Sequence, residues 1–222
     1  MFIDMHMHEK TFSADSFLSL KEMVEIARVK GLGGICVTDH DDMGLKEYAA
    51  WYSKKEDFPI FVGIEYYSLQ GDIVAFGIND YPKVRISAQE FVNMVKEQNG
   101  ICFAAHPFRD NNRGLEDNLD TIQGLDGVEV LNGNTSLKAC ILADEYVKKY
   151  GYIPIGSSDC HIKEKVGVYA TYFPREVKTL KELIEVFKEG DVKPAYYFEG
   201  KYHILANICL PKTTSVIEYI YN

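Results

Sequence analysis

Several features that would mark a familiar class of protein are missing from this sequence of 222 residues. Its five cysteines are odd in number and widely spaced, with no C-x-x-C pair, which argues against a disulfide framework and a thiolate zinc knuckle. No G-x-G-x-x-G or G-x-x-x-x-G-K-[ST] loop occurs, so a nucleotide-cradling fold has no support. No apolar run has the length of a membrane span, and the N-terminus lacks a basic segment followed by an apolar one. We expect a reduced, cytoplasmic protein with no membrane partner.

Positive charge is also scarce, since 24 Lys and Arg residues stand against 33 Asp and Glu residues, for a formal net charge of -9. An extended nucleic-acid-binding surface would need clustered Lys and Arg, so we do not expect one. A nucleotide substrate stays compatible with this charge, because bound cations can reverse the local field. A short oligonucleotide therefore remains among the candidate substrates.

Short apolar runs alternate with amphipathic segments along the chain. The apolar runs predict strands at residues 2–8, 33–40, 59–67, 72–78, 101–107, 127–132, 153–161, 166–173 and 192–198. The amphipathic segments predict helices at residues 19–31, 43–55, 87–100, 135–151 and 179–190, four of which end in glycine: Gly31, Gly100, Gly151 and Gly190. Such alternation favours parallel β-α-β units, and about seven of them in a chain this short favour a compact or incomplete barrel. We expect a single α/β domain over residues 1–222.

Titratable side chains gather where the predicted strands end. The first strand carries Asp4, His6 and His8 on alternate positions, which share one face of a strand. The other strand-end residues of this kind are His40, Glu65, His106, Asp159 and His161. One such histidine would most often be a hydrogen-bonded structural residue, but burying so many titratable groups unpaired would cost several kcal/mol each. Coordination of divalent cations removes that cost, and mixed histidine and carboxylate ligands without thiolate suit Mn, Fe or Zn.

These residues fall in ordered motifs that resemble the PHP family, named for its polymerase and histidinol phosphatase members. The motifs are DMHMH at 4–8, a lone aspartate at Asp15, TDHD at 38–41, GIE at 63–65, AHP at 105–107 and SSDCH at 157–161. The resemblance covers nearly the whole chain. It implies a distorted (β/α)7 TIM-like barrel, with two or three divalent metal ions at the strand C-termini and hydrolysis of phosphoesters.

The resemblance also implies a set of metal ligands. The first ion would take His6, His8, Glu65 and Asp159, and the third would take Asp15, His40 and His161. Glu65 would bridge the first ion to a second one, which would also take His106. Where many family members have a histidine soon after this glutamate, the present chain has Asp72. Aspartate is also a metal ligand, so the second site is either intact with altered metal preference, or weak or empty.

The expected chemistry is hydrolysis by a water or hydroxide that bridges two ions, because such a water is acidic enough to be a nucleophile at neutral pH. The residues expected to carry catalysis are Glu65, Asp159, Arg109 and His161. Arg109 would grip a phosphate oxygen, with Arg113 on the same loop behind it. His161 or His40 would protonate the leaving oxygen if it is not engaged by metal. Supporting positions would orient a histidine or line the pocket: Asp4, Asp39, Asp41, Glu129 and Asn132.

The sequence thus predicts a metal-dependent phosphoesterase acting on a small phosphorylated substrate, such as a nucleotide, a short oligonucleotide or a sugar or amino-alcohol phosphate. One alternative is a metal-dependent amide or ester hydrolase, because bridged metals in barrel sites also perform that chemistry. Another is a non-catalytic metal-binding regulatory module. Nothing in the chain selects histidinol phosphate as the substrate.

Overall fold

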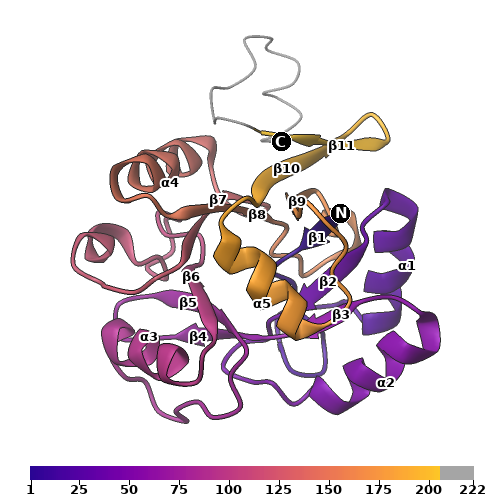
Figure 1. Cartoon of the computed structure of the whole chain (residues 1–222), viewed down its shortest axis with the longest axis horizontal. Helices are drawn as coiled ribbons and strands as arrows, with labels where there is room; N and C mark the ends of the chain where they lie inside the picture. The colour runs from indigo at the N-terminus through magenta and orange to yellow at the C-terminus, as the bar shows by residue number, and fades with distance from the viewer. Residues whose placement is uncertain (206–222) are drawn as a thin grey trace.

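The structure is a computed structural model, and it describes residues 1–205 of the chain. It is a mixed α/β fold in which the helices lie around the strands (Figure 1). None of the helices within this range combines the length and the apolar character that a membrane crossing requires. Cys209 and the last part of the predicted domain lie outside the described residues. The cysteines at 36, 102, 140 and 160 are free and buried.

The predicted elements are present, mostly shorter than the apolar runs that predicted them. The strands are β1 (Phe2–Asp4), β2 (Gly34–Val37), β3 (Ile60–Val62), β4 (Ile64–Tyr67), β5 (Asp72–Phe76), β6 (Ile101–Ala104), β7 (Gly127–Asn132), β8 (Ile153–Ser157), β9 (Tyr169–Tyr172), β10 (Lys193–Phe198) and β11 (Lys201–Ile204). The helices are α1 (Leu20–Lys30), α2 (Lys46–Glu56), α3 (Ala88–Glu97), α4 (Leu137–Tyr150) and α5 (Leu180–Glu189), with short 3-10 turns at 116–120 and 163–165. Strand β11 was not among the predicted elements.

The strands form two sheets, in the orders β11-β10-β9-β1-β2-β3 and β4-β5-β6-β7-β8. The expected parallel pairing is confirmed for β1, β2 and β3 and for β6, β7 and β8. It is wrong for the remaining pairs of named strands, which are antiparallel. For β4 and β5 the reason is a connection of only four residues, too few for a crossover helix. The antiparallel β5 therefore starts at the edge where β4 and β6 end. This places Asp72 at the same edge as the ends of the parallel strands.

The ladders between the named strands of residues 1–205 do not close the two sheets into one ring, although isolated parallel bridges at His40–Glu65 and Met7–Cys160 connect them. The sheets meet on one side at Gly63, between β3 and β4, where a Cβ atom would lie 2.5 Å from the carbonyl oxygen of Ala75. On the other side, the Thr171 hydroxyl takes the place of a backbone ladder. It donates to the carbonyl of Gly156 at 2.8 Å and accepts from the Gly156 N–H at 3.2 Å. The α/β architecture is as expected, and a closed barrel is not confirmed.

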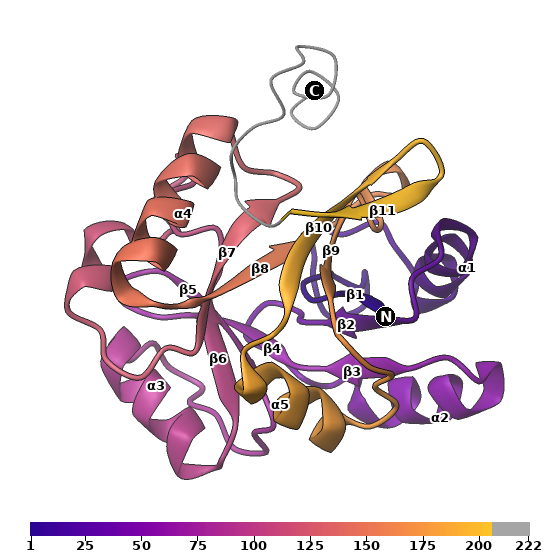
Figure 2. The ribbon, with the colours of Figure 1, turned by 45° about the horizontal axis from the view of Figure 1, so that its top comes forward.

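A single apolar core fills the space between the inner faces of the two sheets. It contains inward residues of both sheets, such as Ile3, Val74 and Phe103, together with Val186 and Phe187 of α5. Helix α5 lies across the strands in Figure 1, and the turned view in Figure 2 shows it at one end of them. A second apolar layer packs the other helices against the outer faces. The helix covers one end of the core, which leaves the opposite end of the strands for polar side chains.

The helix boundaries follow from local capping chemistry. Ser19, Ser87 and Thr179 form capping boxes at the starts of α1, α3 and α5. Three of the four predicted glycine stops are confirmed, with left-handed backbone at residues 31, 151 and 190. The fourth is wrong, since α3 ends at Glu97 with Gln98 as its C-cap, and the left-handed residue that follows is Asn99. Gly100 instead provides close packing, because a Cβ there would lie 2.5 Å from the carbonyl oxygen of Phe76.

Candidate metal centre

The predicted ligand residues converge at one end of the strands, opposite α5. The histidines follow the strand ends by two to four residues: His6 and His8 follow β1, His40 follows β2, His106 follows β6 and His161 follows β8. The carboxylates lie in or beside the strands: Glu65 in β4, Asp72 at the start of β5 and Asp159 just after β8. Both sheets therefore contribute to the same cluster. The carboxyl ends of parallel strands are the usual position of sites in α/β folds.

The four residues predicted to hold the first ion lie within contact distance of one another. His6 Nε2 lies 2.9 Å from His8 Nε2, 3.4 Å from Glu65 Oε1 and 3.5 Å from Asp159 Oδ1. His8 Nε2 lies 3.1 Å from Asp159 Oδ1 and 3.5 Å from Glu65 Oε2. All four side chains are buried. Ligand-type atoms of His6, His8 and Asp159 thus lie within 4.8 Å of one another, and Glu65 contacts both histidines.

Hydrogen bonds fix which nitrogen of these two histidines carries the proton. His6 Nδ1 donates to the Glu129 carboxylate at 2.9 Å. His8 Nδ1 lies 3.2 Å from Ser13 Oγ, whose own hydrogen is donated to Asp39 at 2.8 Å, so Nδ1 is the donor there too. A neutral imidazole that donates from Nδ1 has its lone pair on Nε2. Two lone pairs 2.9 Å apart repel each other, and a shared cation or proton between them removes that repulsion.

Glu65 lies at the centre of the cluster and contacts histidines on both sides of it. Its Oε1 is 2.9 Å from His106 Nε2, and its Oε2 is 2.7 Å from His40 Nδ1 without the alignment of a hydrogen bond. Glu65 Oε2 and Asp159 Oδ1 are buried and have no hydrogen-bond partner among the described residues. Buried polar atoms are normally satisfied, so these two oxygens require a partner that the protein does not supply. A divalent cation fits that requirement.

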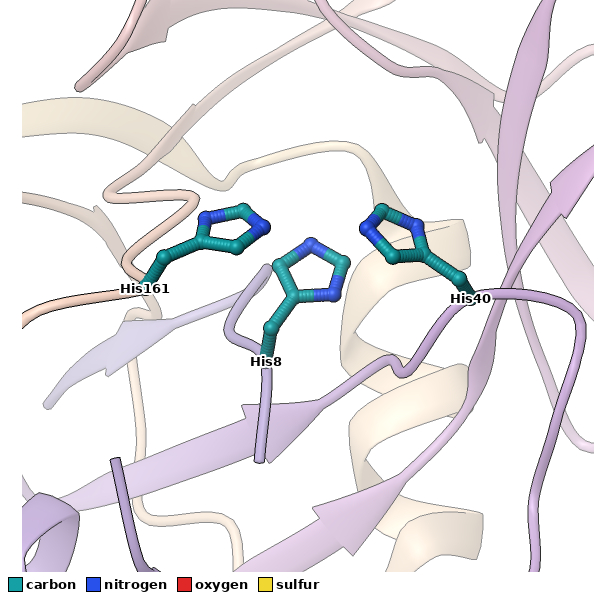
Figure 3. A group of neighbouring side chains, drawn as sticks. All are labelled: His8, His40 and His161. Carbon is teal, nitrogen blue, oxygen red and sulfur yellow. The ribbon is translucent and has the colours of Figure 1, made fainter. Parts of the chain in front are cut away.

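The outer side of the cluster is formed by Asp15, His40 and His161. Asp15 Oδ2 lies 3.2 Å from His40 Nε2 and 3.3 Å from His161 Nε2. Figure 3 shows His8 between the rings of His40 and His161, and the ring centroids of these two lie 4.2 and 4.3 Å from that of His8. The Asp15 side chain is 61% exposed, whereas His40 and His161 are largely enclosed. This side of the cluster opens to solvent.

Three sets of side chains have ligand atoms within 4.8 Å of one another, as binding of one ion requires. They are His8, His40 and His161; His6, His8 and Asp159; and Glu65, Asp72 and His106. The first two sets offer nitrogen and oxygen atoms that fit a divalent ion. The third set does not fit in the same way, because Arg113 already donates to Asp72 Oδ2 from Nε at 2.6 Å and to Oδ1 from Nη2 at 2.8 Å.

Two cluster residues have unusual backbone conformations. His106 has a φ of 29° and Asp159 a φ of 48°, in the region that non-glycine residues seldom occupy. Such conformations cost roughly 1–3 kcal/mol each and persist where the surrounding structure enforces them. The Glu129 carboxylate helps to do so, because it accepts from the backbone N–H of His106 at 2.8 Å. The backbone is held in the conformation that turns both side chains into the cluster.

The protonation behaviour of the cluster reflects its mixture of buried acids and bases. Burial alone would lower the pKa of His6, but the Glu129, Asp159 and Glu65 carboxylates raise it well above the usual value. Burial dominates at His8 and lowers its pKa to about 4. Against the opposing effect of burial, His6 keeps the pKa of both Glu65 and Asp159 well below the usual range. Both carboxylates are therefore charged at neutral pH and His8 is neutral, whereas His6 would have to lose a proton when an ion binds.

A cavity of about 110 Å³ opens onto the cluster. Its lining combines the ligand-type side chains with two arginines and an amide: Asp15, His40, Glu65, Asp72, His106, Arg109, Asn111, Arg113, Asp159 and His161. Arg109 was predicted to grip phosphate, and it lies in this lining. Its guanidinium also donates to the carboxylate of Asp159 and, at 2.6 Å, to Asn132 Oδ1. Arg113, for which a solvated loop charge was the alternative, is instead paired with Asp72.

Several supporting residues act differently from the sequence prediction. Asp4 was expected to orient a histidine through its ring, but its carboxylate accepts from the backbone N–H groups of Ser158 at 2.9 Å and Gly167 at 3.2 Å. Asp41 accepts from the backbone N–H of Tyr67 at 2.8 Å. Asp39 reaches His8 only through Ser13. These acids shape the loops that carry the ligands.

The residue that orients His6 is Glu129, which was predicted only as a pocket-lining residue. Its carboxylate accepts from the ring of His6, the backbone of His106, the hydroxyl of Ser157 and, at 2.9 Å, the amide of Asn132. The signal in the sequence was a lone acid in the buried strand GVEVLN. Ser13 gave no signal, because a loop serine has no distinctive pattern.

Comparison with known proteins agrees with this architecture. The sequence model of a family described as PHP-associated matches residues 138–192 of this chain. The uncharacterized protein MJ1587 of Methanocaldococcus jannaschii is 29% identical over 139 residues, which cover 58% of this chain and 80% of that protein. The predicted resemblance to the PHP family is confirmed.

Solved structures share the fold at low sequence identity. A proposed metal-dependent phosphoesterase of Bifidobacterium adolescentis has a TM-score of 0.65 and 19% identity, covering 85% of this chain and 96% of that one. An amidohydrolase of Chromobacterium violaceum, with bound sulfate and no metal, has a TM-score of 0.65 and 18% identity, with coverages of 89% and 98%. The lesion-specific endonuclease PfuEndoQ of Pyrococcus furiosus has a TM-score of 0.64 and 18% identity, and the match covers 87% of this chain but 57% of the endonuclease. At these identities the likeness concerns the fold.

Proposed function

We propose that this chain is a metal-dependent phosphoesterase that hydrolyses a small phosphorylated substrate. The observation that carries the proposal is the composition of the cavity, in which histidine and carboxylate ligands stand beside Arg109 and Arg113. Ligand-type side chains alone would fit any metal-assisted hydrolysis. Two guanidinium groups in the same cavity favour an anionic substrate, because arginine matches the geometry of phosphate oxygens.

The ions that we propose for this centre are Mn, Fe or Zn. The residues that would hold them are His6, His8, Asp15, His40, Glu65, Asp159 and His161, while His106 contacts Glu65 at 2.9 Å. When bound, divalent ions would lower the pKa of a water molecule and neutralise charge on the phosphoryl oxygens. The family fold to which this site would belong is the distorted (β/α)7 barrel, in one domain over residues 1–222, and a cytoplasmic location stays a prediction.

The side chains of the chain itself have separate tasks in this proposal. Arg109 would bind a phosphoryl oxygen, and its bonds to Asp159 and Asn132 hold it in place for that task. Glu129 and Ser13 keep the Nε2 lone pairs of His6 and His8 directed at the cluster. Since these groups are already fixed before the substrate binds, little reorganisation accompanies the reaction.

Two roles were predicted for His161, as a metal ligand and as the proton donor to the leaving oxygen, and its hydrogen bond bears on the choice between them. Its Nδ1 lies 3.0 Å from the backbone carbonyl of Asp159, which can only accept, so Nδ1 is the donor. The lone pair of the neutral ring is then on Nε2, beside Asp15. This arrangement favours a ligand role for His161 over protonation of the leaving oxygen.

The size of the cavity supports a small reacting group. Its volume of about 110 Å³ is well below the roughly 300 Å³ at which pockets begin to enclose drug-sized ligands. A phosphoryl group fits this volume, and the leaving group would lie outside it at the open side near Asp15. The proposal therefore covers nucleotides, ends of short oligonucleotides, and sugar or amino-alcohol phosphates.

The proposal is tested with purified protein stripped by a chelator and reconstituted with Mn, Fe or Zn. We expect turnover on a panel of phosphomonoesters and phosphodiesters only after reconstitution. Arg109→Ala should raise KM for these esters by about 10- to 100-fold, because one charge-assisted hydrogen bond to phosphate is lost. Arg175→Ala, in an exposed ion pair with Glu189, is the matched control and should leave KM unchanged.

Two other functions are separated by the same measurements. An amide or ester hydrolase would act on neutral substrates, and Arg109→Ala would spare them. A non-catalytic metal-binding module would bind the ions and show no turnover on either panel. Absence of turnover with metal bound would therefore contradict the phosphoesterase proposal.

A further inference from the structure

Arg109 and Arg113 each donate to a carboxylate of the candidate metal centre. Arg109 donates to one carboxylate oxygen, whereas Arg113 donates to both. Arg109 donates to one oxygen of Asp159, Oδ2. The other oxygen, Oδ1, has no hydrogen-bond partner among the described residues and lies 3.1 Å from His8 Nε2. Asp159 therefore keeps one free oxygen that points at the centre of the cluster and can bind an ion.

Arg113 engages both oxygens of Asp72. Its Nε donates to Oδ2 at 2.6 Å and its Nη2 donates to Oδ1 at 2.8 Å, in the two-pronged geometry that is the strongest arginine–carboxylate pairing. The Asp72 side chain is fully buried. The oxygen nearer to His106 is Oδ2, at 3.7 Å from His106 Nε2. An ion held jointly by Asp72 and His106 would need this oxygen, which is already bound to the guanidinium.

The guanidinium of Arg113 also packs against the ring of Tyr67. Its Cζ lies 4.3 Å from the centre of the Tyr67 ring, and Arg85 lies 3.6 Å from the same ring. The backbone N–H of Tyr67 donates to Asp41 at 2.8 Å, which fixes the end of β4 that carries the ring. Stacking of this kind orients a planar cation and restricts its movement.

We propose that the guanidinium of Arg113 takes the place of a metal ion at Glu65, Asp72 and His106, so that the centre binds two ions and not three. This inference rests on the proposed function, since it assumes that the remaining ligands bind metal. An ion bound about 2.1 Å from Asp72 Oδ2 would lie less than about 5 Å from Arg113 Nε, and the two positive charges would repel each other. The fixed cation therefore neutralises Asp72 and excludes the ion.

The test is the metal content of the protein after reconstitution with Mn²⁺ and removal of free metal, measured by plasma mass spectrometry together with titration calorimetry. We expect the wild type to hold two ions per chain. Arg113→Met should gain a third ion, because it frees both oxygens of Asp72. Asp72→Asn should stay at two ions, since Asp72 binds no metal in the wild type. Arg85→Met, which removes the cation on Tyr67 that does not touch Asp72, is the matched control and should stay at two.

Three ions in the wild type, falling to two in Asp72→Asn, would overturn the inference and leave the proposed function intact. Two ions in a folded Arg113→Met variant would also overturn it, because the guanidinium would then not be what excludes the third ion. No bound metal in any variant would overturn the proposed function and the inference with it. If Arg113→Met does not fold, as judged by circular dichroism, Arg113→Gln serves in its place, and Asp72→Asn tests the inference independently.

Discussion

The inner and outer sides of the candidate metal centre differ in how far the protein encloses them. On the inner side, the His6 and His8 side chains are fully buried, and each ring is oriented by a hydrogen bond from Nδ1. On the outer side, Asp15 is 61% exposed and reaches His40 and His161 across the opening to solvent. The inner side is thus prepared for an ion before it arrives, whereas the outer side has one ligand that must be ordered on binding. We expect tighter binding of an ion on the inner side.

The largest loss of metal affinity is expected when the hydrogen bond that orients His6 on the inner side is weakened. Glu129→Gln removes the charged acceptor of His6 Nδ1, which lowers the basicity of the Nε2 ligand atom. We expect the affinity for the inner ion to fall by about 10- to 100-fold, as for other residues that orient metal-binding histidines. Competition with a fluorescent chelator measures this change.

Glu145→Gln is the matched control for that experiment, because Glu145 is an exposed residue of α4. It should leave the metal affinity as in the wild type. If Glu129→Gln also leaves it unchanged in a folded protein, orientation by Glu129 does not contribute to binding on the inner side.

A smaller effect is expected on the outer side. Asp15→Asn keeps an oxygen at the position beside His40 and His161 but removes its charge. Because this carboxylate is exposed, its attraction for an ion is screened by solvent, and we expect less than about a tenfold loss of affinity, for the outer ion only. Calorimetric titration resolves the two ions if their affinities differ. A loss as large as that of Glu129→Gln would contradict the difference between the two sides.

The smallest effect is on thermal stability, and it concerns the ion pair between Lys163 and Glu22. Lys163, just after His161, lies 2.7 Å from Glu22 of α1, and its hydrogen bond, followed by that of Ser19, lowers the pKa of Glu22 to about 2. A depressed acid pKa stabilises the fold at pH values above the unfolded pKa of 4.5, and the effect disappears as the pH falls towards 2. Glu22→Gln should therefore lower Tm slightly at pH 7, and the two melting curves should converge near pH 2.

The same experiment includes its own control, because the comparison is between two pH values for one pair of proteins. A Tm difference that is equal at pH 7 and pH 2 would mean that the Glu22 charge does not contribute. Metal affinity should not change in either case, since Glu22 contacts none of the ligands.

The sequence predicts which histidines and carboxylates the fold brings together, because their signal is local. A histidine or carboxylate immediately after an apolar run is visible in the chain itself, and the alternating pattern of residues 4–8 places two of them on one face. Folding brings such strand ends together, so the convergence of His6, Glu65 and Asp159 follows from the order of strands and helices.

The support of these ligands is not visible in the same way, because it depends on contacts between distant segments. His6 and Glu129 are 123 residues apart, and Arg113 and Asp72 are 41 apart. Periodicity also does not reveal strand direction. The strand at 72–78 was therefore predicted without its antiparallel direction, which is what places Asp72 within reach of Arg113.

The central claim is that His6, His8, Glu65 and Asp159 bind a divalent ion. The most direct test is anomalous diffraction from crystals of the protein soaked in Mn²⁺, recorded at the manganese absorption edge. We predict a strong anomalous peak at about 2.0–2.3 Å from the Nε2 atoms of His6 and His8 and from Asp159 Oδ1. Crystals with Mn²⁺ in the solvent and no anomalous peak among these atoms would contradict the claim.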